Sequence, residues 1–351
     1  MTNAAEAFRQ SHPDLFFLDP GDTASLEQFL KVRGILAPAS RVVAASKAGE
    51  GNMNCTLRVA TTEGPLIVKQ ARPWVEKYPQ FAAPWDRACR EAEFYQAIAR
   101  VPQLARMMPR LIDFDPDARV LMLEDLGDNR DYTGLYAGEN LDDSDVEEMA
   151  GFLARLHRCI PCSGEHRGLA NREMRELNHS HIFVVPLTAA NGLDLDNITP
   201  GLAQAARFLQ SDADYVDEVS RLGSEVYLAD GGSLLHGDFF PGSLLRTKAG
   251  PRVIDPEFAF FGRPEFDVAV FLAHLILSNQ PPAMRRLWRE AYDAPSGFDN
   301  PLMLQLAGVE IMRRLIGYAQ LPVRGLKPKC DLLELSRTLV LRPGMQLVEA
   351  A

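Results

Sequence analysis

The sequence predicts an α+β protein with a β-rich N-terminal part and a mostly helical C-terminal part. Residues 41–71 contain three short β-rich runs separated by glycine-containing turns, which is the pattern of an antiparallel meander. Apolar residues at helical spacing follow over 86–101, and residues 109–127 then add two more strand-like runs. Beyond that point the spacing is mostly helical. We therefore expect an N-terminal lobe over residues 1–126 and a C-terminal lobe over residues 127–351.

The remaining elements follow from local signals. The first 40 residues are expected to be helical, with a helix start at Asp22-Thr23, because Asp is a favoured helix N-cap residue. A long helix is expected at the start of the C-terminal lobe, where Asp-Ser-Asp precedes an apolar stripe. Two short strand-like runs interrupt the helical lobe near Leu234 and Val253. Further helices are expected over 198–229, 265–278, 283–292 and 302–320.

Composition excludes several classes of protein. The chain has 351 residues, of which 46% are hydrophobic and 24% charged, close to the average for globular domains. It is therefore not a disordered chain, a collagen-like fibre or a disulfide scaffold. Asp and Glu number 47 against 37 Lys and Arg, which gives a net charge of −10 and no basic focus. We expect no nucleic-acid partner.

Targeting signals are also missing from the pattern. The N-terminus lacks a basic segment followed by an apolar one, and no apolar run approaches the roughly 20 residues of a membrane span. The five cysteines are an odd number in mostly apolar surroundings, which favours reduced thiols. These features predict a cytoplasmic protein with no membrane partner.

Acidic residues follow buried strand-like runs between residues 233 and 275. Asp238 ends His-Gly-Asp, and Asp255-Pro-Glu257 comes seventeen residues later. Carboxylates after two short strands joined by a tight turn can converge, and Mg²⁺ takes carboxylate and phosphate oxygens together. We expect Asp238 at an arriving hydroxyl and Asp255 and Glu257 at Mg-ATP. Asp267 is expected to orient the loop through backbone hydrogen bonds.

The N-terminal lobe contains residues that suit a nucleotide. Gly49, Gly51 and Asn52 lie in a turn between two strand-like runs, where backbone N–H groups could approach phosphates. Lys69 ends the next run and could reach the α- and β-phosphates, and Glu91 on the following helix could pair with it. Taken alone, a glycine-rich turn is more often only a turn, and a lone strand-end lysine is usually solvated.

The order of these motifs narrows the fold. The apolar run that contains Glu124 and Leu126 suits a hinge whose backbone binds adenine, and it precedes the His-Gly-Asp and Asp-Pro-Glu motifs. No GxxxxGK[ST] motif is present, which excludes a Walker-type NTPase. The layout resembles the aminoglycoside phosphotransferase and choline kinase superfamily. That resemblance implies a eukaryotic-protein-kinase-like fold with two lobes, ATP as phosphoryl donor and Mg²⁺ as cofactor.

Within this superfamily the motifs resemble those of 5-methylthioribose kinases. The resemblance covers roughly residues 40–325 and is most specific from His236 to Asp267. Most of the superfamily has an Asn five residues after the catalytic Asp, whereas this chain has Ser243. It also has Asp-Pro-Glu where a single metal-binding Asp is usual.

The resemblance implies a role for each matching residue. Asp238 would accept the proton of the sugar's anomeric hydroxyl, and Arg313 and Arg314 would contact the sugar and the transferring phosphate. Asp255 and Glu257 would hold magnesium, with Ser243 as a further candidate at that site. The resemblance also implies a homodimer and a place in methionine salvage.

Adjacent arginines in the otherwise apolar helix around Arg313 and Arg314 cannot both face a core at low cost, so an anionic partner or a C-lobe carboxylate is expected. Trp85 matches a tryptophan of the family and is a candidate substrate contact, although its surroundings differ. The chain is also shorter than these kinases between Asn279 and Gly308.

Alternatives remain open for the acceptor. A related pentose such as 5-deoxyribose is compatible with the same motifs, and so is another small hydroxyl compound of the superfamily, an amino-alcohol or an aminoglycoside. The paired arginines argue against those cationic acceptors. A nucleotide-binding pseudokinase is disfavoured because Lys69, Asp238, Asp255 and Glu257 are all present.

Overall fold

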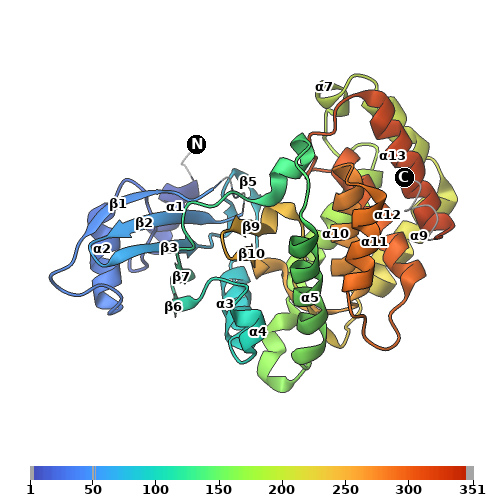
Figure 1. Ribbon diagram of the computed structural model, residues 1–351. Coiled ribbons are helices and arrows are strands. Elements are labelled where there is room, and N and C mark those ends of the chain that lie inside the picture. The colour runs from blue at the N-terminus through green and yellow to red at the C-terminus, as the bar shows by residue number, and fades with distance from the viewer. Residues whose placement is uncertain (1–3, 50, 52, 345–351) are drawn as a thin grey trace. The chain divides into compact units, whose positions relative to one another are not determined.

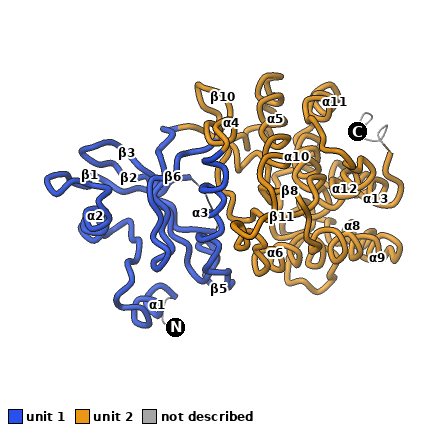
Figure 2. The backbone as a smooth tube through the Cα atoms, turned by 90° about the horizontal axis from the view of Figure 1, so that it is seen from below, with its two compact units in different colours: residues 1–100, 108–128 blue, residues 101–107, 129–351 orange. Residues whose placement is uncertain are grey.

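A computed structural model describes residues 4–49, 51 and 53–344 of the chain. The chain forms two compact units, coloured separately in Figure 2. Unit 1 comprises residues 1–100 and 108–128, and unit 2 comprises residues 101–107 and 129–351. The predicted α+β class is confirmed, because unit 1 is built on a β-sheet and unit 2 is mostly helical.

Unit 1 contains an antiparallel five-stranded sheet with the strand order β1-β2-β3-β7-β6. The five strands are β1 (Val42–Lys47), β2 (Cys55–Thr61), β3 (Gly64–Gln70), β6 (Leu111–Asp115) and β7 (Val120–Glu124). They correspond to the five strand-like runs that the sequence predicts. Three helices accompany them in this unit: α1 (Ala4–Ser11), α2 (Thr23–Val32) and α3 (Arg87–Ile98).

Alternating burial explains how this sheet makes a core. Leu57 and Val59 of β2 are buried while the residues between them are only partly covered. They pack with Leu26 and Leu30 of α2 in one apolar cluster. The predicted start of this helix is confirmed, since the Asp22 carboxylate accepts a hydrogen bond from the Ser25 N–H at 2.9 Å.

One element of unit 1 differs from the prediction. No strand is predicted between the run that ends at Lys69 and the helical segment over 86–101, whereas the structure forms a short antiparallel hairpin there, β4 (Trp74–Val75) with β5 (Tyr78–Ala82). The β4 strand has only two residues, and every residue of β5 is exposed. Such short segments carry no alternation of apolar and polar residues, so a sequence pattern does not reveal them.

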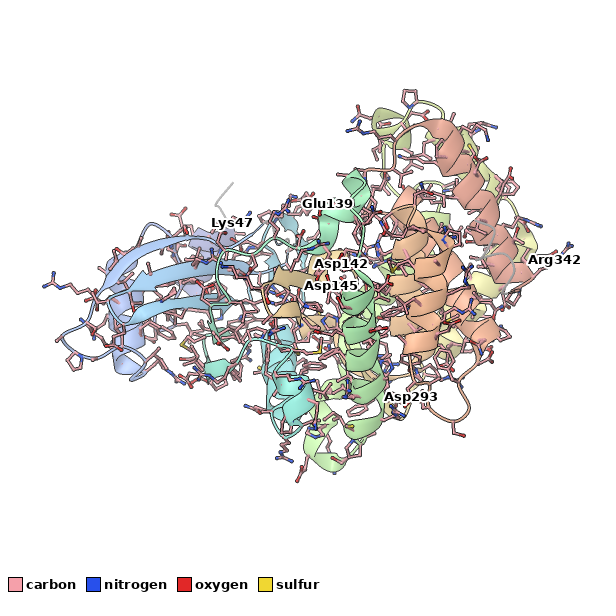
Figure 3. The ribbon with its side chains drawn as sticks, in the orientation of Figure 1. Lys47, Glu139, Asp142, Asp145, Asp293 and Arg342 are labelled. Carbon is pink, nitrogen blue, oxygen red and sulfur yellow. The ribbon has the colours of Figure 1, made fainter. Side chains whose placement is uncertain are left out.

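Unit 2 is a set of packed helices (Figure 1). Every residue of α10 (Glu265–Leu277) is buried, and α5 (Asp143–Cys159), α11 (Pro282–Ala291) and α12 (Asn300–Ile316) pack around it. Figure 3 shows Asp142 and Asp145 at the N-terminal end of α5 and Asp293 beside its other end. Smaller or peripheral helices complete the unit: α4 (Pro102–Ala105), α6 (Arg172–His179), α7 (Leu195–Ile198), α8 (Leu202–Gln210), α9 (Ala213–Arg221) and α13 (Leu326–Leu341).

Short strand pairs in unit 2 position its loops. Strand β8 (Ser233–Leu235) pairs with β11 (Phe260–Gly262), and β9 (Leu244–Thr247) pairs with β10 (Gly250–Val253), both antiparallel. The predicted strand-like runs near Leu234 and Val253 are therefore confirmed. The chain between these pairs carries the His-Gly-Asp and Asp-Pro-Glu motifs. In the part of the chain that the structure describes, no helix has the length and apolar character needed to cross a bilayer.

Helix α13 is not among the predicted helices, although it packs extensively on α12. Ser336 of α13 is fully buried and donates a hydrogen bond to the carbonyl oxygen of Gly308 on α12 at 2.7 Å. The Tyr215 hydroxyl on α9 lies 2.7 Å from the Ser336 Oγ. Because the serine proton already serves Gly308, the tyrosine is the donor in this second bond. One serine therefore joins three helices.

We predict that Ser336→Ala destabilises unit 2 more strongly in the natural background than in a Tyr215→Phe background. Removal of the serine hydroxyl leaves the buried tyrosine hydroxyl without its acceptor, at a cost of about 1–3 kcal/mol. In the Tyr215→Phe background that penalty disappears. Urea unfolding of the two single variants and the double variant would measure the coupling. Equal costs of Ser336→Ala in both backgrounds would refute it.

Candidate active site

The His236-Gly237-Asp238 loop leaves the end of β8 with a constrained backbone. Gly237 has a φ of +82°, in the left-handed region that favours glycine. A Cβ atom there would lie 2.1 Å from the carbonyl oxygen of Phe258, closer than atoms can approach. A glycine is therefore required at this position on both counts.

Asp267 at the start of α10 holds this loop by hydrogen bonds to its backbone. Its two carboxylate oxygens accept hydrogen bonds from the backbone N–H groups of His236 at 2.7 Å and Gly237 at 3.0 Å. The His157 Nε2 lies 3.2 Å from the same carboxylate, and both side chains are fully buried. The predicted orienting role of Asp267 is confirmed by these bonds.

Asp238 extends from this loop toward two arginines of α12. Its Oδ1 accepts hydrogen bonds from the Nη2 atoms of Arg313 at 3.2 Å and Arg314 at 3.4 Å. The Asp238 side chain is 22% exposed, whereas the two arginine side chains are 7% and 6% exposed. The guanidinium of Arg314 also lies over the Phe240 ring, 4.6 Å from its centroid. The structure thus brings together three predicted residues at one partly open carboxylate.

A buried glutamate fixes the two arginines. The Oε2 and Oε1 of Glu310 accept hydrogen bonds from the Nε atoms of Arg313 at 2.6 Å and Arg314 at 2.7 Å. Burial alone would raise the pKa of Glu310, but the two guanidinium groups outweigh it and hold that pKa well below its ordinary value. Glu310 is therefore ionised. The sequence expectation that a C-lobe carboxylate could pair with these arginines is confirmed.

The network continues to His274 and Tyr136. The His274 Nε2 lies 3.1 Å from Glu310 Oε1, and the Tyr136 hydroxyl lies 2.6 Å from His274 Nδ1. Burial lowers the pKa of His274 to about 4 and raises the pKa of Tyr136, so both groups are neutral near pH 7. A neutral tyrosine donates to Nδ1, which leaves the histidine proton on Nε2 to serve Glu310.

Sequence reasoning missed Glu310, His274 and Tyr136. A signal for the first was available, since Glu310 precedes Arg313 and Arg314 by three and four residues, the helical spacing at which ion pairs form. Tyr136 and His274 are 138 residues apart in the chain. No spacing rule connects them.

The second acidic motif begins with an unusual backbone. Asp255 has a φ of +59° and a ψ of +53°, a left-handed conformation that is rare for residues other than glycine. The imidazole of His236 lies 2.9 Å from the carbonyl oxygen of Ile254, which links this segment to the His-Gly-Asp loop. Aspartate is among the residues that adopt this conformation most readily after glycine, and the metal-binding role of Asp255 stays a prediction.

The other two predicted metal ligands, Glu257 of this motif and Ser243, are both buried. Glu257 is 5% exposed, and the side-chain amide of Asn171 donates to its carbonyl oxygen at 3.0 Å. Ser243 is 3% exposed, and its carbonyl oxygen accepts from the Ile254 N–H at 3.0 Å. The backbone of Ser243 thus supports the segment that ends in Asp255.

The donor set suits magnesium in the way that the sequence predicts. Asp255 and Glu257 offer the hard carboxylate oxygens that Mg²⁺ binds together with nucleotide phosphates and water. Among the described residues no group of three or more His, Cys, Asp or Glu side chains could hold a metal by itself. Two carboxylates that share an ion with a nucleotide need no such group.

Unit 1 contains a buried ion pair at the predicted positions. The Nζ of Lys69 on β3 lies 2.8 Å from one Glu91 oxygen and 3.0 Å from the other, and the side chains are 3% and 1% exposed. The predicted pairing of these residues is confirmed. Glu91 therefore holds the lysine ammonium at the end of β3, where a nucleotide phosphate could meet it.

The other predicted nucleotide contacts are less defined by side chains. Gly49 has a φ of +72° in the turn after β1, and Gly51 is exposed, while Asn52 lies outside the described residues. Glu124 ends β7, with its backbone N–H donating to the carbonyl oxygen of Arg110 at 2.9 Å. Leu126 is half-buried just before the chain enters unit 2. Their contacts with a nucleotide stay predictions.

Trp85 packs inside unit 1. Its indole N–H donates to the carbonyl oxygen of Ala71 at 3.0 Å, and its ring meets the Phe8 ring edge-on at 5.3 Å. The guanidinium of Arg119 lies 5.0 Å from the indole centroid. These contacts explain the position of Trp85 by packing alone. Its contact with substrate stays a prediction.

The chain is similar in sequence to bacterial methylthioribose kinases. The chain is 27% identical to methylthioribose kinase of Exiguobacterium sibiricum, over 82% of this chain and 83% of that protein. It is 26% identical to methylthioribose kinase of a Geobacillus species, over 91% and 89% of the two chains. Both matches cover most of each protein.

Comparison with solved structures shows the fold. Choline kinase from Streptococcus pneumoniae matches with a TM-score of 0.51 at 14% identity, over 90% of this chain and 98% of that one. Spectinomycin phosphotransferase, solved with ADP and spectinomycin, also matches with a TM-score of 0.51 at 13% identity, over 93% and 92%. The predicted protein-kinase-like fold, with a sheet in the N-terminal part and helices in the C-terminal part, is confirmed.

The sequence profile of the phosphotransferase enzyme family matches residues 44–303, almost three quarters of the chain and a span that contains the buried Lys69–Glu91 pair, the His-Gly-Asp loop and the Asp-Pro-Glu motif. The chain belongs to the phosphotransferase enzyme family.

Proposed function

We propose that this protein transfers the γ-phosphoryl group of ATP to the anomeric hydroxyl of 5-methylthioribose or a closely related pentose. The observation that carries the proposal is the pair of buried arginines that both donate to Asp238. The named relatives support it, since methylthioribose kinases match over most of the chain.

The arginine pair bears on the class of acceptor. Each guanidinium has five N–H donors, and the hydrogen bonds to Glu310 and Asp238 use an Nε and an Nη2 of each. The remaining donors can bind hydroxyl oxygens of a sugar or oxygens of the transferring phosphate. An amino-alcohol or an aminoglycoside would instead bring a cation beside guanidinium groups whose charges Glu310 and Asp238 already balance, so the cluster offers that cation no net negative charge. The site therefore favours a neutral polyol.

The chain's own residues supply positioning and charge. Asp238 would accept the hydroxyl proton as the sugar oxygen attacks phosphorus, and the arginines would stabilise the charge that develops on the transferred group. Lys69 would neutralise phosphate charge, held in place by Glu91. Magnesium held by Asp255 and Glu257 would draw charge from the phosphates. A loose transition state needs little covalent help beyond this.

Turnover measured with a set of different acceptors tests the proposal directly. ATP consumption with Mg²⁺ would be followed with methylthioribose, 5-deoxyribose, ribose, choline and kanamycin as separate acceptors. We expect the highest kcat/KM with methylthioribose or 5-deoxyribose and negligible turnover with the two cationic compounds. Preference for choline or kanamycin would overturn the proposal. Silence on every acceptor with nucleotide still bound would contradict the proposed acceptor class and favour the pseudokinase alternative.

We predict that Asp238→Asn lowers kcat with the preferred acceptor by about 10²–10⁴-fold, the usual contribution of a general base. The amide keeps the shape of the side chain but cannot take the proton. ATP binding, measured by calorimetry, should stay close to the natural value. Asp255→Asn, by contrast, should weaken Mg²⁺-dependent nucleotide binding. Near-normal turnover in Asp238→Asn, or an unchanged Mg²⁺ dependence in Asp255→Asn, would refute the respective role.

We also predict a pH-dependent stability that comes from His274. Its pKa falls from 6.5 in the free side chain to about 4 in the folded protein, so the unfolded chain binds the proton more tightly. Stability from this group is therefore present above pH 6.5 and is lost as the pH falls toward 4, by about 3 kcal/mol in all.

His274→Gln should remove this dependence, because the amide can still donate to Glu310 but does not titrate. Urea unfolding at several pH values between 7 and 4.5 would measure it. The stability difference between natural protein and variant should shrink as the pH falls. A difference that stays constant or grows would show that His274 is protonated in the folded protein.

A further inference from the structure

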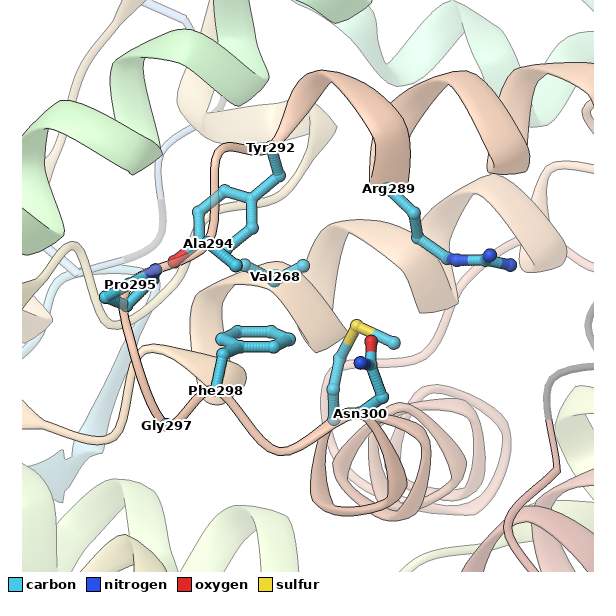
Figure 4. Close-up of a pocket in the computed structure, with 9 residues that line it drawn as sticks. Val268, Arg289, Tyr292, Ala294, Pro295, Gly297, Phe298 and Asn300 are labelled. Atoms are coloured by element: carbon cyan, nitrogen blue, oxygen red, sulfur yellow. The ribbon is translucent and has the colours of Figure 1, made fainter.

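Unit 2 contains a second pocket, apart from the carboxylates and arginines of the candidate active site. It has a volume of about 320 Å³, at the lower end of the range for small-molecule sites. Figure 4 shows the rings of Tyr292 and Phe298 gathered with Val268, while Asn300 and Arg289 lie at the other end. The walls come from α10, the C-terminal end of α11, the connecting loop and the first turns of α12.

Contacts hold the connecting loop at both ends, an exposed ion pair at one end and a buried carboxylate at the other. Asp293 pairs with Arg158 of α5 at 2.6 Å. At the other end the Asp299 N–H donates to the buried carboxylate of Glu265 at 2.7 Å, and the Asp299 side chain accepts from the Leu302 N–H at 3.0 Å and so caps α12. A preformed pocket binds with a smaller ordering cost than one that must be assembled.

The chemistry of the lining is polarised. Two aromatic rings, with centroids 5.3 Å apart, form an apolar end together with Val268. The guanidinium of Arg289 and the carboxamide of Asn300 supply the polar groups. Asn300 is also the first residue of the 17-residue helix α12, whose positive end favours negative charge. An aromatic body with one carboxylate matches both ends, since guanidinium groups recognise carboxylates in a bidentate manner.

Tyr292 joins the pocket to the catalytic loop by hydrogen bonds. Its ring lines the pocket, while its hydroxyl lies 2.8 Å from the Nδ1 of His157. The other nitrogen of His157 reaches Asp267 at 3.2 Å, and Asp267 holds the N–H groups of His236 and Gly237. All side chains of this chain of contacts are buried. A ligand that packs on the Tyr292 ring therefore acts on the residues that position Asp238.

We propose that this pocket binds a small aromatic carboxylate and that its occupancy adds to the protection of the catalytic loop against local opening, through Tyr292, His157 and Asp267. The inference concerns binding and loop order, and it stands whether or not the proposed acceptor is correct.

The test uses 3-phenylpropionate as the probe and its uncharged amide, 3-phenylpropionamide, as the matched control. Binding of each to the full-length protein would be measured by ligand-observed NMR titration. We expect saturable binding of the carboxylate and at least about tenfold weaker binding of the amide, because a charge-assisted hydrogen bond is lost. Absence of saturation up to the solubility of the probe, or equal binding of both compounds, would overturn the proposal.

Variants locate the binding. Arg289→Gln should weaken binding of 3-phenylpropionate by about tenfold or more. Arg286 is an exposed arginine of the same helix outside the lining, and Arg286→Gln should leave that affinity unchanged. Asn300→Asp adds a negative charge without a change in shape, and acids are favoured in the first turn of a helix, so the fold is preserved. This substitution should weaken binding of 3-phenylpropionate but not binding of its amide. Unchanged affinity in Arg289→Gln and Asn300→Asp would place the probe elsewhere.

Hydrogen exchange tests the connection. Saturating probe should slow amide exchange in the peptide that contains residues 233–240, and Tyr292→Phe should keep binding but lose this protection, since it lacks the hydroxyl that meets His157. Binding with no change in exchange of that peptide would overturn the connection. Protection that persists in Tyr292→Phe would show that it takes another route.

Discussion

The buried carboxylate of Glu310 sets the geometry around Asp238. Two guanidinium groups at 7% exposure or less would be costly to bury without a fixed counter-charge, and Glu310 bonds to the Nε atom of each. With Nε held, their Nη2 atoms point at one oxygen of Asp238. Two positive and two negative charges result, a formally neutral cluster with only the aspartate partly open to solvent.

A second buried carboxylate, that of Asp267, holds the backbone of the His236-Gly237-Asp238 loop, as Glu310 holds the arginines. Both of its oxygens hold the turn at Gly237, where a left-handed φ and the nearby Phe258 carbonyl leave room only for glycine. Asp267 belongs to α10, every residue of which is buried. The His236-Gly237-Asp238 loop is thus tied to a helix that is buried along its whole length, and these bonds fix the backbone just before Asp238.

The same two helices, α10 and α12, also line the second pocket. Helix α12 contributes the arginines near its C-terminal end and the pocket wall at its N-terminal end. Helix α10 contributes both Asp267 and the Val268 next to it. The arginines that meet Asp238, the carboxylate of Asp267 and the walls of the pocket therefore belong to the same two helices.

The sequence by itself determined the five strands of the main sheet of unit 1, the Lys69–Glu91 pair and the acids after β8 and β10, because each of these depends on periodicity or on residues near one another in the chain. Only the tertiary structure decided the contact of the arginines with Asp238, the contact of Tyr136 with His274 and the contact of His157 with Asp267. The last two join residues 138 and 110 positions apart. Local spacing carries no record of which distant side chains a packed core brings within hydrogen-bond distance.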